Sequence, residues 1–182
     1  CIQGHNLMNN YLIHKVKPLD RIESGLYLVI LHASDIPPHI GIIYNEKYFS
    51  LTVAGQTLGD DVQVLKKLIH RKKIKTLFIR LVDGLNSMDN IRNTFLEEKR
   101  VQGNITCLFP IKKVLAEMYD KSIARVKFIY DVLPVLYKTK SIDAVYHLNM
   151  NEEIENGTFS FTRYTMDDIL DRIKSYETEE LC

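Results

Sequence analysis

Two residues of this 182-residue chain have a type and a position suited to nucleophilic chemistry, Cys107 and His39. Cys107 directly precedes residues 108–119, whose apolar spacing predicts a helix. A thiol at a helix N-terminus meets unpaired backbone N–H groups and the positive end of the helix dipole, and both favour the thiolate. The same N–H groups can bind an oxyanion. We therefore predict that Cys107 is a nucleophile.

His39 is the best candidate for the base that such a nucleophile needs. Pro37 and Pro38 precede it and restrict the backbone, and the strand expected after it fixes the direction of the imidazole. His32 is the rival base, because it ends the preceding apolar strand and could reach the same cleft. A histidine at this position more commonly caps a strand end, so the prediction for His39 depends on its pairing with Cys107.

The segment after His39 is expected to form a hairpin with its turn at Asn45 and Glu46. If the residues that flank the turn pair with each other, His39 falls opposite Thr52, and Ser50 lies on the same face. Either hydroxyl could then orient the imidazole. A hydroxyl holds an imidazolium less strongly than a carboxylate or an amide does.

Apolar periodicity predicts the elements that must position these residues. We expect strands at residues 25–31, 40–44, 47–53, 74–82 and 157–164, and helices at residues 59–73, 87–100, 108–119 and 165–176. Residues 123–150 fit either an alternating strand or a helix interrupted at Pro134. The expected fold class is α+β, with an antiparallel sheet packed against the helix that begins at Cys107.

Composition excludes several classes of function. The chain has 24 Lys and Arg against 23 Asp and Glu, a formal charge of +1, so we expect no nucleic-acid partner. No apolar run is long enough to span a membrane, and no basic and apolar leader is visible, so the chain reads as soluble and cytoplasmic. We expect no cofactor and no metal, because no His, Cys, Asp or Glu cluster has metal-ligand spacing.

Three cysteines, at positions 1, 107 and 182, make a poor disulfide framework and suit a reducing compartment. Residues 1–10 are expected to be an expression tag or a disordered N-terminus. No repeat, low-complexity tract or linker divides the remainder, so residues 11–182 are expected to form a single domain.

The ordered segments "ESGLYLVIL", "PPHIGIIYNEKYFSL", "GDDVQVLKKLIHRKKIKTLFIRL" and "NITCLFPIKKVL" together resemble the circularly permuted NlpC-type members of the papain-like clan. These members include YiiX-like bacterial hydrolases and, more distantly, the lecithin retinol acyltransferase group. The likeness runs over residues 24–119, with a weaker echo at residues 165–173. It implies a circularly permuted papain-like fold.

The resemblance also implies site residues and an activity. Cys107 matches the family's nucleophile and His39 its base, and Ser50 matches the return-strand position where the family usually has His or Glu. Such sites cleave or transfer acyl groups at amide or ester bonds through a thioester, in peptides, cell-wall peptides or lipid-linked acyl substrates. The expected function is therefore that of a cysteine hydrolase or acyltransferase, with a peptide or acyl-bearing partner.

Two alternatives stay open. The hydroxyl of Ser50 or Thr52 at the third position makes a non-catalytic binding module on the same fold a second reading. A third reading is an interaction protein of unrelated fold, which requires residues 123–150 to be helical and the hairpin to lie away from the centre of the sheet. Whether the Cys107 sulfur lies in an open cleft beside the His39 ring separates the enzyme from the other two readings.

Overall fold

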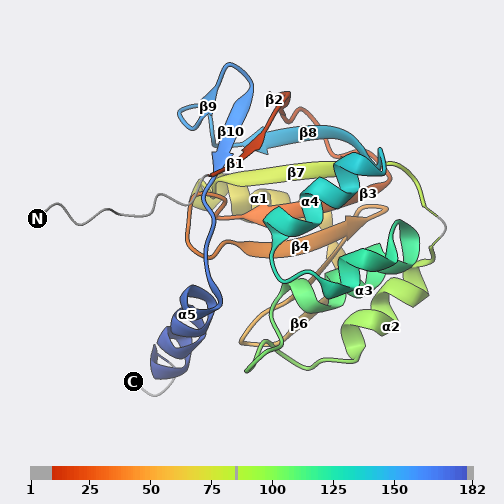
Figure 1. Ribbon diagram of the computed structural model, residues 1–182, viewed down its shortest axis with the longest axis vertical. Coiled ribbons are helices and arrows are strands. Elements are labelled where there is room, and N and C mark those ends of the chain that lie inside the picture. The colour runs from red at the N-terminus through yellow and green to blue at the C-terminus, as the bar shows by residue number, and fades with distance from the viewer. Residues whose placement is uncertain (1–9, 85, 180–182) are drawn as a thin grey trace, which may run out of the picture.

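The structure is a computed structural model that describes residues 10–84 and 86–179 (Figure 1). Residues 1–9, which carry most of the segment expected to be a tag or disordered, lie outside the described residues, as does Cys182. The strands are β1 (Tyr11–Ile13), β2 (Val16–Pro18), β3 (Leu26–Leu31), β4 (His39–Tyr44), β5 (Lys47–Leu51), β6 (Gln56–Asp61), β7 (Thr76–Leu81), β8 (Ile142–Leu148), β9 (Ile154–Glu155) and β10 (Thr158–Phe161).

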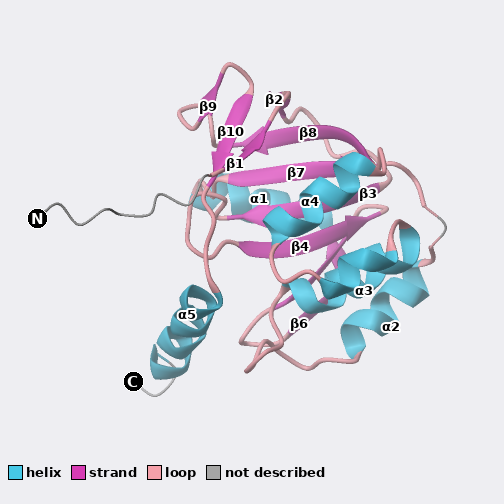
Figure 2. Ribbon diagram, in the orientation of Figure 1, coloured by secondary structure: helices cyan, strands magenta, loops and turns pink. Residues whose placement is uncertain are grey.

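The chain forms helices and two sheets (Figure 2). The helices are α1 (Val62–Lys72), α2 (Met88–Leu96), α3 (Leu108–Met118), the short 3-10 helix η1 (Lys121–Arg125), α4 (Ile129–Lys138) and α5 (Met166–Glu179). The larger sheet has seven strands in the order β2-β8-β7-β3-β4-β5-β6, and the smaller has three in the order β1-β10-β9. All neighbours in the larger sheet are antiparallel except β2 and β8. The α+β class is therefore confirmed.

The larger sheet is covered on both faces, which explains why every residue of β3 is buried. Leu28 and Ile30 pack into one core with residues of α2, α3 and α4. Tyr27 and Val29 point to the other face, where they pack with residues of α1. Figure 1 shows α3 and α4 in front of the sheet and α1 behind it. A strand buried on both faces reads as an unbroken apolar run, as β3 does.

The hairpin forms as expected from β4 and β5. Tyr44 pairs with Lys47, and Gly41 pairs with Ser50, so the predicted register is confirmed. Asn45 and Glu46 both have positive φ angles, 44° and 64°, which is the geometry of a two-residue turn that matches strand twist. β5 ends at Leu51 rather than at residue 53.

Helices α1, α2 and α5 each differ from the prediction by several residues at one end, and α5 continues to Glu179 rather than ending at residue 176. The helix expected at 59–73 begins only at Val62, because residues 56–61 pair with β5 as the edge strand β6. Asp61 caps the helix instead of lying within it, and its carboxylate accepts a hydrogen bond from the Gln63 N–H at 2.8 Å. The helix expected at 87–100 covers only Met88–Leu96, and the Ser87 hydroxyl caps it by accepting a hydrogen bond from the Asn90 N–H at 3.1 Å.

The ambiguous segment 123–150 contains both alternatives. It holds the end of η1, then α4 with Pro134 inside it, and then the strand β8. Burial of five α4 residues outweighs the hydrogen bond that Pro134 cannot make. The hairpin strands β4 and β5 stand fifth and sixth in the seven-stranded order, next to the edge strand β6, and α4 makes part of the segment helical. The reading of an unrelated fold therefore stays open. None of the helices within the described residues is long and apolar enough to cross a membrane.

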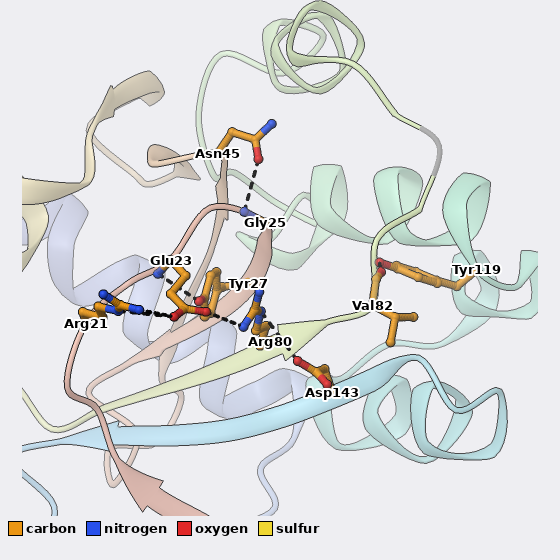
Figure 3. Close-up of polar contacts among 9 residues, drawn as sticks. All are labelled: Arg21, Glu23, Gly25, Tyr27, Asn45, Arg80, Val82, Tyr119 and Asp143. Atoms are coloured by element: carbon orange, nitrogen blue, oxygen red, sulfur yellow. Dashed lines mark hydrogen bonds and ion pairs between the residues drawn. The ribbon is translucent and has the colours of Figure 1, made fainter.

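One end of the larger sheet, where β3 and β5 begin and β4 ends, is closed by polar contacts that Figure 3 shows. Glu23 accepts a hydrogen bond from Arg80 at 2.8 Å and another from Arg21 at 3.0 Å. The Asn45 side-chain oxygen accepts from the Gly25 N–H at 3.2 Å. We call this the closed end of the sheet, defined by Glu23, Gly25, Asn45 and Arg80.

Candidate active site

The opposite end of the sheet, where β3 and β5 end and β4 begins, opens into a pocket of about 610 Å³. We call it the open end. Its walls come from the loop between β3 and β4, the loop after β5, the last turn of α1, the start of α3, and one side of α5. α5 lies at this end of the sheet, well separated from α2 at the closed end (Figure 1). A concave and largely apolar pocket of this size is typical of a small-molecule site.

Cys107 lines the pocket directly before the first residue of α3, as predicted. Its side chain is half-buried. Burial raises the pKa of the thiol above its ordinary value of 9.0, while the backbone N–H groups of Ile40, Cys107 and Leu108 act in the opposite direction. Burial is the larger effect, so the resting group at neutral pH is the thiol, not the thiolate predicted from the helix N-terminus.

His39 is the first residue of β4 and lines the same pocket. It pairs with Leu31 of β3 and is half-buried. Burial, together with the nearby His32, lowers the pKa of the imidazole from 6.5 to about 4. His39 is therefore a neutral imidazole at pH 7, which is the form that accepts a proton.

Strand alternation places the two residues on different faces of the sheet. His39 shares the face of Gly41 and Ile43, which packs against α1, while Cys107 begins the helix that covers the other face. The pocket extends around the start of β4, so both side chains line it. No hydrogen bond joins the Cys107 sulfur to the His39 ring within the described residues. The two side chains therefore share a cavity and are not hydrogen-bonded to each other.

Neither hydroxyl predicted to orient the imidazole contacts it. The β4–β5 ladder ends at the pair of Gly41 and Ser50, so His39 and Thr52 lie beyond it. Thr52 lines the pocket, but its hydroxyl donates to the Gly55 carbonyl at 3.1 Å and accepts from the Gly55 N–H at 3.2 Å. Ser50 is 2% exposed and lies beside the Tyr48 hydroxyl instead.

His32, the rival base, also lines the pocket. Its Nδ1 lies 3.7 Å from a carboxylate oxygen of Asp35, so this histidine has the acidic neighbour that His39 lacks. Its side chain is 52% exposed, which leaves the ring free to exchange contacts with water. The structure thus brings both predicted bases to one pocket. Half-buried His39 forms no ion pair with a carboxylate in the described part of the chain, whereas exposed His32 lies beside Asp35.

Two tyrosines near Cys107 were not singled out from the sequence, Tyr48 and Tyr164, and Tyr164 lines the pocket. Burial raises the pKa of Tyr48 to about 12 and raises that of Tyr164 as well, so both hydroxyls stay protonated, and Cys107 contributes to both shifts. A Cβ on Gly41 would lie 2.7 Å from the Tyr48 hydroxyl oxygen. Gly41 is the feature of the sequence that could have indicated this close approach of Tyr48, because a glycine inside a strand indicates close approach of another group.

α5 completes the pocket from the far end of the chain. Thr165 caps it, and its hydroxyl accepts a hydrogen bond from the Asp168 N–H at 3.3 Å. Ile169 and Ile173 pack in a small apolar cluster with Leu51, and this cluster also touches Cys107. The thiol is therefore half-buried by a helix that lies more than fifty residues away in the sequence.

Within the part of the chain that the structure describes, no group of three or more His, Cys, Asp or Glu side chains could hold a metal ion. The pocket lining contains a thiol, two imidazoles and one carboxylate, but no phosphate-binding loop. Comparison with protein-family models, with curated proteins and with solved structures gave no significant match. The chemistry of the pocket must therefore be inferred from its own residues.

Proposed function

We propose that this chain is a cysteine-dependent hydrolase or acyltransferase of the permuted NlpC type, acting on an amide or ester bond. One observation supports it best: the Cys107 thiol and a neutral His39 imidazole line a single apolar pocket. Backbone N–H groups of Cys107 and Leu108 face the sulfur and are suited to stabilise negative charge that develops beside it.

In the proposed reaction, a substrate carbonyl enters the pocket next to Cys107. The sulfur attacks the carbonyl carbon while His39 takes the thiol proton, and the carbonyl oxygen becomes an oxyanion held by the N–H groups of Cys107 and Leu108. Collapse of this intermediate expels the amine or alcohol, which receives the proton from His39. Water, or an acceptor hydroxyl or amine, then gives a proton to His39, attacks the thioester and restores the thiol.

The resting protonation states indicate how this reaction begins. Burial raises the thiol pKa and lowers that of His39 to about 4, so neither group is charged near neutral pH. Proton transfer must then accompany the attack rather than precede it. The expected mechanism is general-base catalysis by His39, not attack by a preformed thiolate–imidazolium pair.

Acylation by an activated ester tests the proposal. The variant Cys1→Ser/Cys182→Ser leaves Cys107 as the only thiol, and p-nitrophenyl acetate and p-nitrophenyl octanoate serve as acyl donors. We expect mass spectrometry to find one thioester on Cys107, with nitrophenol release at least about 10³-fold slower after Cys107→Ser. A control, Lys17→Gln, is exposed on β2 outside the pocket lining and should leave the rate unchanged. Release that is equally fast without the thiol would refute the proposed nucleophile.

The second candidate is a binding module on the same fold. It is favoured by the raised thiol pKa and by the engagement of Thr52 with Gly55 rather than with His39. A module of this kind would bind ligands in the pocket without forming an acyl-enzyme. Ligand binding with no thioester on Cys107, even after prolonged incubation with both esters, would establish this second candidate.

A further inference from the structure

We propose that the pocket at the open end binds an amphiphile with one aliphatic chain and an anionic head group. The chain would lie among the apolar walls, and the head group would lie at the mouth beside Lys72, Lys127 and Arg172. The inference goes beyond the proposed function, because this binding requires neither the thiol of Cys107 nor the imidazole of His39.

The walls of the pocket are suited to an aliphatic chain. Leu51 and Val101 are buried at its floor together with Ile173 of α5. Leu31, Leu68 and Ile74 add aliphatic surface on the side of α1. Methylene groups that leave water for such walls each contribute about 0.8 kcal/mol to binding, whereas an unpaired polar group costs binding energy there. A peptide backbone would leave many such groups unpaired, so a hydrocarbon chain fits better.

Three cations from three different elements line the mouth. Lys72 is the last residue of α1, Lys127 precedes α4, and Arg172 belongs to α5. Both lysines are exposed, and in the described part of the chain neither forms an ion pair with a carboxylate. Arg172 reaches Asp35 at 4.0 Å. An anionic head group would supply the partner that the two lysines lack.

The balance of charge at the mouth excludes a cationic head group. Asp35 is the one carboxylate among the pocket-lining residues that the structure describes, against the three cations. It lies 4.0 Å from Arg172, so part of its charge is already engaged by one of these cations. Long lysine and arginine side chains can lie along an apolar wall and keep their charge at the water boundary. This is the arrangement that an amphiphilic anion requires.

Calorimetric titration of the Cys107→Ser variant tests the ligand class without chemistry at the thiol. Dodecanoate, dodecyl phosphate and dodecyltrimethylammonium share one chain length and differ in head group, and each is used below its critical micelle concentration. We expect both anions to bind and the ammonium compound to bind at least about tenfold more weakly. Decanoate should bind about tenfold more weakly than dodecanoate, because it has two methylene groups fewer.

The two anions also distinguish the origin of the head group. Tighter binding of dodecanoate would indicate a free carboxylate, and tighter binding of dodecyl phosphate would indicate a phosphorylated lipid. Equal affinity for the anions and the cation would overturn the role of the three cations. Equal affinity for decanoate and dodecanoate would overturn the role of the apolar walls. No binding of any amphiphile would overturn the proposal.

Variants locate the site. Lys72→Gln and Lys127→Gln should each weaken dodecanoate binding about two- to fivefold, and the matched control Lys17→Gln, exposed on β2, should not. Ala54→Trp, at an exposed position of the pocket wall, should abolish binding, whereas Ala124→Trp, exposed on η1, should not. Circular dichroism checks that each variant is folded. Unchanged binding in folded Ala54→Trp protein would place the ligand elsewhere.

Discussion

The two ends of the larger sheet differ in how their polar side chains are hydrogen-bonded. At the closed end, Glu23 accepts hydrogen bonds from Arg80 and Arg21, and Asn45 ties the hairpin turn to Gly25. At the open end, His39 makes no hydrogen bond with Cys107, Ser50 or Thr52. Paired polar groups stabilise a fold, and unpaired ones beside a cavity are free to act on a ligand.

The same strands connect both ends, so the difference comes from what covers them. Arg80 and Asn45 bring partners to the start of β3, while the start of β4 lines a pocket together with residues of α3 and α5. Burial is the largest effect on both pKa values at the open end and shifts each toward the neutral form. The comparison predicts that pH acts strongly on the open end and weakly on the closed end.

The largest effect on stability should come from His39 at acidic pH. Its folded-state pKa of about 4 lies below the ordinary 6.5, so the unfolded chain binds the proton first and stability falls as pH drops from 6.5 toward 4. The full shift corresponds to about 3 kcal/mol. His39→Gln should remove this loss. Urea unfolding of both proteins across this pH range measures the difference, and parallel curves would contradict the buried neutral imidazole.

Gly41→Ala should destabilise the strand next to the open end. The added Cβ would lie 2.7 Å from the Tyr48 hydroxyl, in a packed strand that has no room for it. We expect a loss of about 2 kcal/mol in the free energy of unfolding. The double variant Gly41→Ala/Tyr48→Leu should lose less free energy of unfolding than the sum of the losses of the two single variants, because the clash with the tyrosine ring is then gone. Additive costs would show that the glycine serves another purpose.

At the closed end, Asn45→Gly should cost about 1 kcal/mol. Glycine tolerates the positive φ of 44°, so the substitution removes only the contacts of the amide oxygen with the Ser24 hydroxyl, at 2.9 Å, and the Gly25 N–H, at 3.2 Å. Asn45→Ala loses the same contacts and adds backbone strain, so it should be the less stable of the two. Urea unfolding orders the two variants, and the reverse order would contradict this account of the turn.

The smallest effect should come from Glu23→Gln. Hydrogen bonds from Arg21 and Arg80 lower the pKa of Glu23 below 4.5, so its contribution is present above that pH and is lost as pH falls through the folded-state pKa. The melting temperature should drop slightly at pH 7 and match the wild type in strong acid. Glu177→Gln, exposed on α5, is the control. A difference that grows in acid would contradict this assignment.

Regular apolar patterns made much of the fold predictable. The unbroken run of β3, the hairpin around Asn45 and the helix that begins after Cys107 all follow from residue spacing alone. The edge strand β6 was missed because its sequence, QTLGDD, has no apolar alternation and pairs with β5 through its backbone. The segment with Pro134 was ambiguous because burial, which the sequence does not display, decides for the helix.

The site was predictable only in part. Helix-start spacing identified Cys107, and the prolines before the strand singled out His39, and both line one pocket. The faces they occupy depend on which side of the sheet each helix covers, and no local pattern gives that. The contact of α5 with the apolar cluster at Cys107 joins distant segments, so the burial that raises the thiol pKa could not be foreseen.

The pH profile of Cys107 acylation tests most directly the central claim that His39 serves this thiol. Initial rates with p-nitrophenyl acetate would be measured between about pH 5 and 8 in the single-thiol protein and in its His39→Gln variant. Because His39 is already neutral above its pKa of about 4, we predict a nearly flat profile for the histidine form. The variant should depend on free thiolate and rise about tenfold per pH unit. Identical tenfold rises in both proteins would contradict the claim.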